Sequence, residues 1–216
     1  MINDGLMTDD RLLSEKTGEL SGIVENNLEA VLNMLINNNF ESFANNDEDF
    51  YSGRTKKLNN EIHNAIINIL SNKNDRSLYI QALRINSFSI EMQNIFTLIL
   101  LIKFNIKELS KYPLLKRQAS IPNIALLISS IVKNSIDAFF ENDVNSAGKV
   151  LKEIKNIKSL SQKILKELAQ SPIEDDVFAN KSRIVYYSVV ISYLEEIAII
   201  AGGIVTNLVI LSIYND

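Results

Sequence analysis

The sequence predicts an all-helical protein in which six helices form two tandem three-helix bundles. Two observations lead to this prediction. The 216 residues include only seven Gly and three Pro, and a sheet protein of this size would need more turn residues. Apolar residues recur at helical spacing through most of the chain, and short polar runs such as 37–39 and 72–75 separate the apolar stretches.

The first three helices are expected between residues 8 and 110. The first begins near Thr8, whose hydroxyl can cap the next turn, and ends in the Asn run 37–39. The second begins near Asn46 or Asp47 and ends at 72–75. The third runs from about Arg76 to Ser110. The first two carry apolar stripes: Leu20, Val24, Leu28, Val31, Leu32 and Leu35, and then Leu58, Ile62, Ala65, Ile66, Ile69 and Leu70.

The last three helices follow a short linker that ends at Pro122, a residue suited to a first helical turn. The fourth helix ends at 141–143. The fifth carries an apolar face from Ala147 to Leu168. The segment Ser171-Pro172-Ile173-Glu174 is a capping box for the sixth helix, which extends to about Tyr214. The third and sixth helices are apolar around most of their circumference, so we expect them at the centre of the fold.

The two halves resemble each other. Phe43–Asp47 precedes the second helix, and the similar segment Phe139–Asp143 precedes the fifth. Such self-similarity indicates a duplicated three-helix unit. We therefore divide the chain into a first repeat at 8–111 and a second at 119–214.

Composition excludes several classes of function. The chain has no Cys and one His, His63, which removes thiol chemistry and most zinc sites. Its net charge is −4, and nucleic-acid binding normally needs a basic surface. The start MINDGLMTDD has no signal-peptide pattern. We therefore expect an intracellular protein that is not an enzyme, has no organic cofactor and does not bind nucleic acid.

The segment 197–214, IAIIAGGIVTNLVILSIY, has two interpretations. It is about the shortest length that can span a bilayer. Thr206 and Asn207 interrupt it, and neither Lys nor Arg flanks its end. We interpret it as a buried core helix, and membrane contact is the alternative.

The fifth predicted helix is basic, with Lys149, Lys152, Lys155, Lys158, Lys163 and Lys166 against Glu153 and Glu167. Such a local charge can dock an acidic partner or a phosphate-rich surface. It can also be an ordinary solvated face. The first four lysines are the predicted partner-binding residues.

Three segments carry a family resemblance. Residues 137–147 read DAFFENDVNSA, residues 191–198 read ISYLEEIA, and Asp75-Arg76 precedes Ala82-Leu83-Arg84-Ile85. They resemble the helix 4–helix 5 junction, the A-R-Y-L-E-R-I-A-D-H segment, and the D-L-R and A-L-K-I pieces of the PhoU family of phosphate-uptake regulators. The resemblance spans roughly residues 15–214.

The resemblance implies a metal cluster on each bundle, held by an E-x-x-x-D motif. Residues four apart share one helix face, so two carboxylates there can hold a hard cation. This chain departs from the motif. In the second repeat Glu195 holds the Glu position, but Ile199 holds the Asp position four residues later. In the first repeat the two positions hold either Ile90 and Asn94 or, in a register shifted by one residue, Glu91 and Ile95. The acidic positions expected on the second and fifth helices are also replaced, by Thr55, Leu58–Asn59, Ile154 and Lys158. The candidate ligands for a divalent or iron ion are Glu195, Glu91 and Asn94.

The resemblance also implies a non-catalytic function. PhoU-like proteins are cytoplasmic, contact the phosphate ABC transporter and a membrane sensor kinase, and report phosphate sufficiency. We also expect a homodimer, because symmetric dimers are common. The main alternative is a helical adaptor with no phosphate role. A ferritin-like redox bundle would need E-x-x-H pairs, and the sequence has none.

Overall fold

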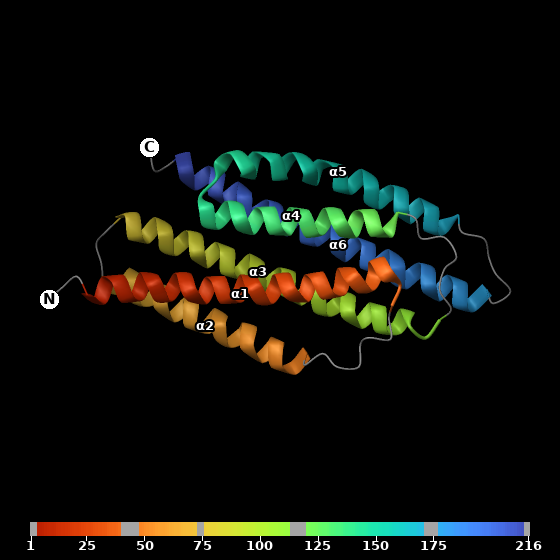
Figure 1. Ribbon diagram of the computed structural model, residues 1–216, viewed down its shortest axis with the longest axis horizontal. Coiled ribbons are helices and arrows are strands. Elements are labelled where there is room, and N and C mark those ends of the chain that lie inside the picture. Colours follow the sequence, from red (N-terminus) through yellow and green to blue (C-terminus); the bar gives the residue numbers. More distant parts are fainter. Residues whose placement is uncertain (1–3, 40–47, 73–75, 113–119, 171–176, 214–216) are drawn as a thin grey trace.

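The computed structural model describes residues 4–39, 48–72, 76–112, 120–170 and 177–213 (Figure 1). The described residues form six α-helices, so the predicted all-helical fold is confirmed. Their bounds are α1 Asp4–Asn37, α2 Glu48–Asn72, α3 Arg76–Leu109, α4 Ile121–Glu141, α5 Val144–Ala169 and α6 Val177–Ile213.

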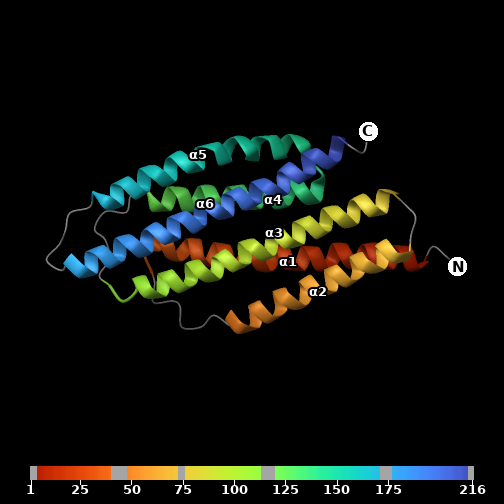
Figure 2. The same ribbon diagram turned by 180° about the vertical axis from the view of Figure 1, so that it is seen from behind.

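The helices form two bundles that lie side by side. α1, α2 and α3 pack on one another, as do α4, α5 and α6, and the two groups meet through α1 against α4 and α3 against α6. α1 and α4 lie in front in Figure 1, α3 and α6 lie in front in Figure 2, and α2 and α5 form the two outer edges. The repeat boundaries 8–111 and 119–214 stay a prediction, because the linker residues 113–119 lie outside the described part of the chain.

The predicted start of the first helix is wrong. α1 already begins at Asp4, so Thr8 lies inside the helix and is not its cap. A Thr can also stand within a helix, so its type alone does not mark a beginning. Leu13 is buried in the core, so the apolar stripe begins before Leu20. Other predicted features lie outside the described residues, namely Asn46 and Asp47, Phe43–Asp47 as a repeat signal, the turn 73–75, the box 171–174 and Tyr214.

The junction of α4 and α5 is built from two adjacent polar residues. Asn142 ends α4 in the left-handed conformation, with a φ of 57°. Asp143 then caps α5, because its carboxylate accepts hydrogen bonds from the amides of Asn145 and Ser146. The hydroxyl of Ser146 donates to the same carboxylate and, with these amides, holds the pKa of Asp143 below its ordinary value. Helix α5 therefore leaves α4 in a fixed direction.

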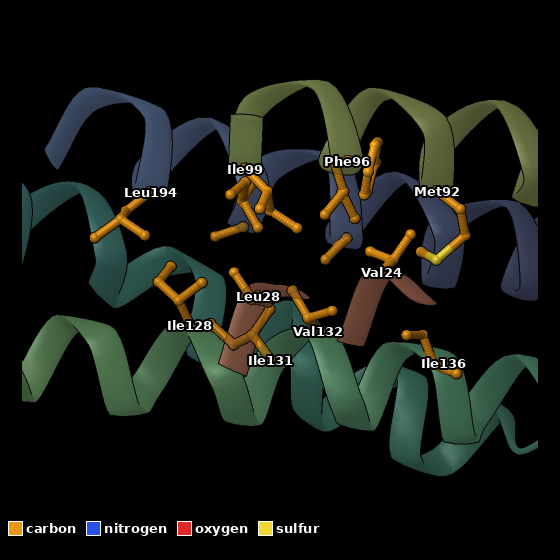
Figure 3. Close-up of a cluster of buried hydrophobic side chains, with 14 of the residues drawn as sticks. Val24, Leu28, Met92, Phe96, Ile99, Ile128, Ile131, Val132, Ile136 and Leu194 are labelled. Atoms are coloured by element: carbon orange, nitrogen blue, oxygen red, sulfur yellow. The ribbon is translucent and has the colours of Figure 1, made fainter. Parts of the chain in front are cut away.

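Both bundles share one hydrophobic core. Side chains from α1, α3, α4 and α6 converge between them (Figure 3), with Val24 and Leu28 facing Met92, Phe96 and Ile99. The cluster continues into α2 and α5, so buried residues of all six helices belong to it. We therefore expect the described bundles to unfold as one unit.

The expectation that α3 and α6 are enclosed on all sides is only partly right. They pack against each other and carry much of the core, but each leaves one stripe in solvent. We call these exposed apolar residues the α3–α6 face; they are Leu83, Ile90, Leu101 and Phe104 on α3, and Phe178, Val185, Ile199 and Ile210 on α6.

Three helices are long and apolar enough to cross a membrane when judged by length and composition alone: α3, α4 and α6 up to Ile210. Between 44% and 50% of the most apolar window of each is buried inside the bundle. In the ambiguous segment 197–214, Ile197, Ala201 and Leu208 are among the buried core residues. This placement agrees with its interpretation as a core helix.

One buried serine leads to a stability prediction. Ser161 on α5 is 0% exposed, and its hydroxyl has no hydrogen-bond partner among the described residues. Replacing it with Ala removes an unpaired polar group and a weaker helix former, so Ser161→Ala should stabilise the protein by about 1 kcal/mol. Thermal unfolding should show a Tm higher by about 2–4 °C.

Ser135 on α4 is the matched control. It is also 0% exposed, but its hydroxyl donates to the carbonyl of Ile131 at 2.7 Å. Ser135→Ala should therefore give a smaller gain or a loss. Equal gains from both variants would contradict the unpaired state of the Ser161 hydroxyl.

Candidate functional site

The predicted metal ligands of the first repeat lie on α3 beside α6. Glu91 is half-buried, and Asn94 donates a long 3.4 Å hydrogen bond to its carboxylate. The other carboxylate oxygen lies over Gly203, 3.4 Å from the point that a Cβ atom would occupy there. Glu91 therefore covers a glycine of the neighbouring helix.

The predicted ligand of the second repeat, Glu195, lies elsewhere on the same pair of helices. Asn207 on α6 donates to the hydroxyl of Ser87 on α3 at 2.8 Å. One turn along both helices, Gly203 lies opposite Glu91, so the two contacts define one alignment of α3 with α6. The two helices run antiparallel (Figure 1), so this register puts Glu195 level with about Ile99, roughly 12 Å along the axis from Glu91. The structure therefore brings Glu91 and Asn94 together and leaves Glu195 apart.

The neighbouring positions on α2 and α5 supply little for a cation. Thr55 is buried and donates to the carbonyl of Ser52, while Asn59 donates to the side chain of Gln93 at 2.8 Å, so neutral groups bridge α2 to α3. In the second bundle Ile154 packs onto Gly202, and Lys158 is exposed.

These residues do not fit the metal cluster that the resemblance implies. Among the described residues, no group of three His, Asp or Glu side chains is placed to hold a metal ion. A neutral amide bridge in one bundle and an apolar contact in the other replace the carboxylates that a hard cation prefers. Binding of a single ion at Glu91 and Asn94, or at Glu195, stays a prediction.

Two grooves beside α4 contain acidic residues that the sequence interpretation missed. One, of about 310 Å³, lies between α4 and α5 and is lined by Asp137, Glu141 and Glu153 among others. The second, of about 220 Å³, lies between α1 and α4 and includes Glu25 and Lys133. Burial raises the pKa of Glu25, nearby Asp137 raises it further, and Lys133 acts in the opposite direction.

Glu25 leads to a pH-dependent prediction. The pKa of Glu25 is raised in the folded state, so the folded protein favours the protonated form. The stability that this carboxyl contributes is present below the unfolded-state pKa, near 4.3 for Glu, and is lost as the pH rises through the higher folded-state pKa. Glu25→Gln should therefore stabilise the protein modestly at pH 7 and lose that advantage near pH 3.

Chemical denaturation at the two pH values measures this difference. Glu29→Gln is the control, because Glu29 lines the same groove from an exposed position on α1. A Glu25→Gln advantage that is equal at both pH values would contradict a raised pKa.

Two further polar residues join helices across the fold. Arg84 on α3 bonds to the carbonyl of Phe139 and to the side chain of Asn142, and its guanidinium lies 4.6 Å from the centre of the Phe139 ring. Lys103 is buried and donates to Asn27 of α1 at 2.9 Å. In the sequence, the only indication of the Lys103–Asn27 hydrogen bond is that each residue stands within an apolar stretch. Arg84 instead ties α3 to the last turn of α4, which joins the two bundles.

The other predicted site residues are exposed. Lys149, Lys152, Lys155 and Lys158 all lie in solvent on α5, at one edge of the molecule (Figure 1), and His63 is exposed on α2. These lysines and the α3–α6 face are two surfaces that a macromolecular partner can reach.

Comparison with family models gives a match in the second half of this chain. Residues 121–207 match the model described as PhoU domain, a range that covers α4, α5 and most of α6. The second bundle therefore matches a PhoU domain. The matched range includes the predicted ligand Glu195, the lysines of α5 and the acidic α4–α5 groove. The suspected resemblance to the PhoU family is therefore confirmed on this bundle.

Comparison with solved structures extends the likeness to the first bundle. The chain is similar to the crystal structure of PhoU from Pseudomonas aeruginosa, with a TM-score of 0.85 and 18% sequence identity over 95% of this chain and 97% of that chain. At this identity the likeness shows the fold, which is that of PhoU over both bundles. Comparison with curated protein sequences gives no match.

Proposed function

We propose that this protein is a non-catalytic cytoplasmic regulator of phosphate uptake that acts by contacting a phosphate ABC transporter and a membrane sensor kinase. The PhoU-domain match over residues 121–207 carries this proposal. The likeness of the whole fold to PhoU from Pseudomonas aeruginosa supports it. The chemistry of the side chains agrees, since the chain has no Cys, and its one His, His63, is exposed on α2.

The α3–α6 face is the surface that we assign to the protein partner. Phe104 and Ile199 on this face are 60% and 59% exposed. Small polar residues such as Thr97 and Thr206 lie exposed between the apolar ones, and the exposed Glu196 adds a charge near Ile199. An amphipathic helix binds such a surface through apolar residues at helical spacing. We therefore propose that a helix of the transporter or the kinase packs along α3 and α6.

We also keep a homodimer in the proposal. Symmetric dimers are the commonest soluble assemblies, and the same apolar face could serve a second copy when no partner is bound. Light scattering at graded protein concentrations measures this association. A mass that stays at 24.4 kDa at every concentration would remove the dimer and leave the regulator.

The alternative function is a helical adaptor without a phosphate role. One observation favours it: Asn59, which donates to Gln93, and Ile154, which packs onto Gly202, stand at positions where the family resemblance implies acidic ligands. If phosphate sensing by such proteins depended on the lost carboxylates, this chain would keep only the scaffold.

Uptake of labelled phosphate by the native cells separates the two functions. Cells without this protein should lose the difference in uptake between ample and scarce phosphate, and the intact chain should restore it. As an adaptor with no phosphate role, the protein would leave that difference unchanged when removed.

A further inference from the structure

Helix α5 carries a concentrated positive charge in an acidic protein. Its 26 residues contain six Lys and two Glu, a net charge of +4, whereas the whole chain carries −4. The helix lies at an outer edge and packs against α4 and α6 (Figures 1 and 2). The remaining side of α5 is therefore available to a partner.

Four of the lysines share the outward side of α5. The buried residues of the helix, which include Val150, Ile157 and Ile164, define its inner side. At 3.6 residues per turn, four lysines point within about 40° of the opposite direction. We call these four residues the lysine face; they are Lys152, Lys155, Lys163 and Lys166, and all are exposed.

The acidic residues of α5 lie off this face. By the same helical geometry, Glu153 and Glu167 point at least about 80° away from its centre. Glu153 instead lines the groove with α4, and Glu167 lies 3.9 Å from Lys163 and accepts a hydrogen bond from Ser120. The lysine face extends about 21 Å along the helix, and Lys is its only charged residue type. Its charge is thus directed outward.

The composition of the face indicates which anionic partner it fits. Protein interfaces are enriched in aromatic residues and Arg and depleted in Lys, and single-stranded nucleic acids need aromatic side chains for stacking. Between Lys152 and Lys166 the outward side of α5 presents Asn156, Ser159 and Gln162, so this stretch offers no apolar or aromatic anchor. A row of flexible lysines without anchors is typical of attraction to a surface of anionic lipids.

We propose that the lysine face binds the anionic headgroups of a membrane surface. Because α5 runs along an edge of the bundle (Figure 1), this contact lays the molecule lengthwise on the membrane. The inference goes beyond regulation of phosphate uptake and does not depend on it. It would raise the local concentration of the protein near any membrane-bound partner.

Vesicle flotation with the purified full chain tests the proposal. The chain should float with vesicles made of equal parts of phosphatidylglycerol and phosphatidylcholine at about 0.1 M salt, and not with phosphatidylcholine alone. At about 1 M salt, where screening shortens the range of the attraction to about 3 Å, it should be released.

Two variants with equal net charge locate the contact. Replacing Lys152, Lys155, Lys163 and Lys166 with Gln should weaken binding about fivefold per lysine, and thus roughly 600-fold in total. The control replaces four exposed lysines on other helices with Gln and should bind like the unchanged chain; these are Lys56, Lys57, Lys107 and Lys181. Circular dichroism confirms that both variants are folded.

Three results would overturn the proposal. They are an absence of flotation with the anionic vesicles at low salt, equal flotation with neutral vesicles, and equal losses in the two variants. Binding of the unchanged chain to an acidic protein or to a nucleic acid, without binding to anionic vesicles, would assign the lysine face to that partner. None of these results changes the expected outcome of the phosphate-uptake test, so each proposal can be contradicted without the other.

Discussion

Phe88→Ala should remove about 3–5 kcal/mol of folding stability, a large share of what a protein of this kind has. Phe88 is 1% exposed on α3 and stacks on Phe139 of α4 with ring centres 3.9 Å apart. Phe140 contacts it edge-on at 5.6 Å. Truncation therefore leaves a cavity where the two bundles meet and removes two aromatic contacts that each add stability beyond burial.

Denaturant unfolding measures this loss, and Phe104→Ala is the control. Phe104 lies on the same helix but is 60% exposed, so its truncation should change stability by only about 0.5 kcal/mol. Phe88→Leu should fall between the two. A cost below about 1 kcal/mol for Phe88→Ala would contradict the stacking of Phe88 on Phe139.

Two adjacent glycines on α6 should respond in opposite directions to larger side chains. A Cβ atom at Gly202 would lie 2.8 Å from the Cδ1 atom of Ile154 on α5, whereas at Gly203 it would meet only the flexible carboxylate of Glu91 at 3.4 Å. Gly202→Leu should therefore destabilise the protein by about 1–3 kcal/mol through overpacking. Gly203→Ala should stabilise it by about 0.5–1 kcal/mol, because Ala is the better helix former.

A second substitution identifies the cause of the Gly202 effect. If Ile154 is the obstacle, Ile154→Ala in the Gly202→Leu background should cost less than Ile154→Ala alone, because the leucine fills the space. Thermal unfolding of the four proteins gives the coupling. Additive costs would mean that α5 and α6 are not in close contact at this point.

The sequence predicted the helices well because their buried stripes are a local pattern. Leu58, Ile62, Ile66 and Ile69 are all buried as the stripe of the second helix predicts. The start of α1 was harder, since a residue type that caps helices, such as Thr8, also occurs inside them. The exposed stripes of α3 and α6 were missed because, in a helix that is apolar on all sides, the sequence pattern does not show which side is buried.

The candidate sites divide in the same way. The lysines of α5 lie on one helix, so its period alone places Lys152 and Lys155 on the lysine face and the other two predicted residues, Lys149 and Lys158, off it. The pairs Glu25 with Asp137, Arg84 with Asn142 and Lys103 with Asn27 join different helices, and no spacing along the chain encodes which helices touch. The separation of Glu91 from Glu195 likewise depends on the register of α3 against α6, which only the fold supplies.

Affinity capture of the tagged protein from its native cells, grown with ample and with scarce phosphate, tests the regulator account most directly. The account predicts that a phosphate transporter ATPase or a sensor kinase co-purifies and that its yield changes with phosphate. Phe104→Asp with Ile199→Asp should lower that yield about tenfold or more, because the pair places charges on the α3–α6 face. The control pair, Leu126→Asp with Ile67→Asp, changes exposed residues on α4 and α2 and should keep the yield. Capture of neither partner under either condition would contradict the phosphate assignment and leave a helical adaptor.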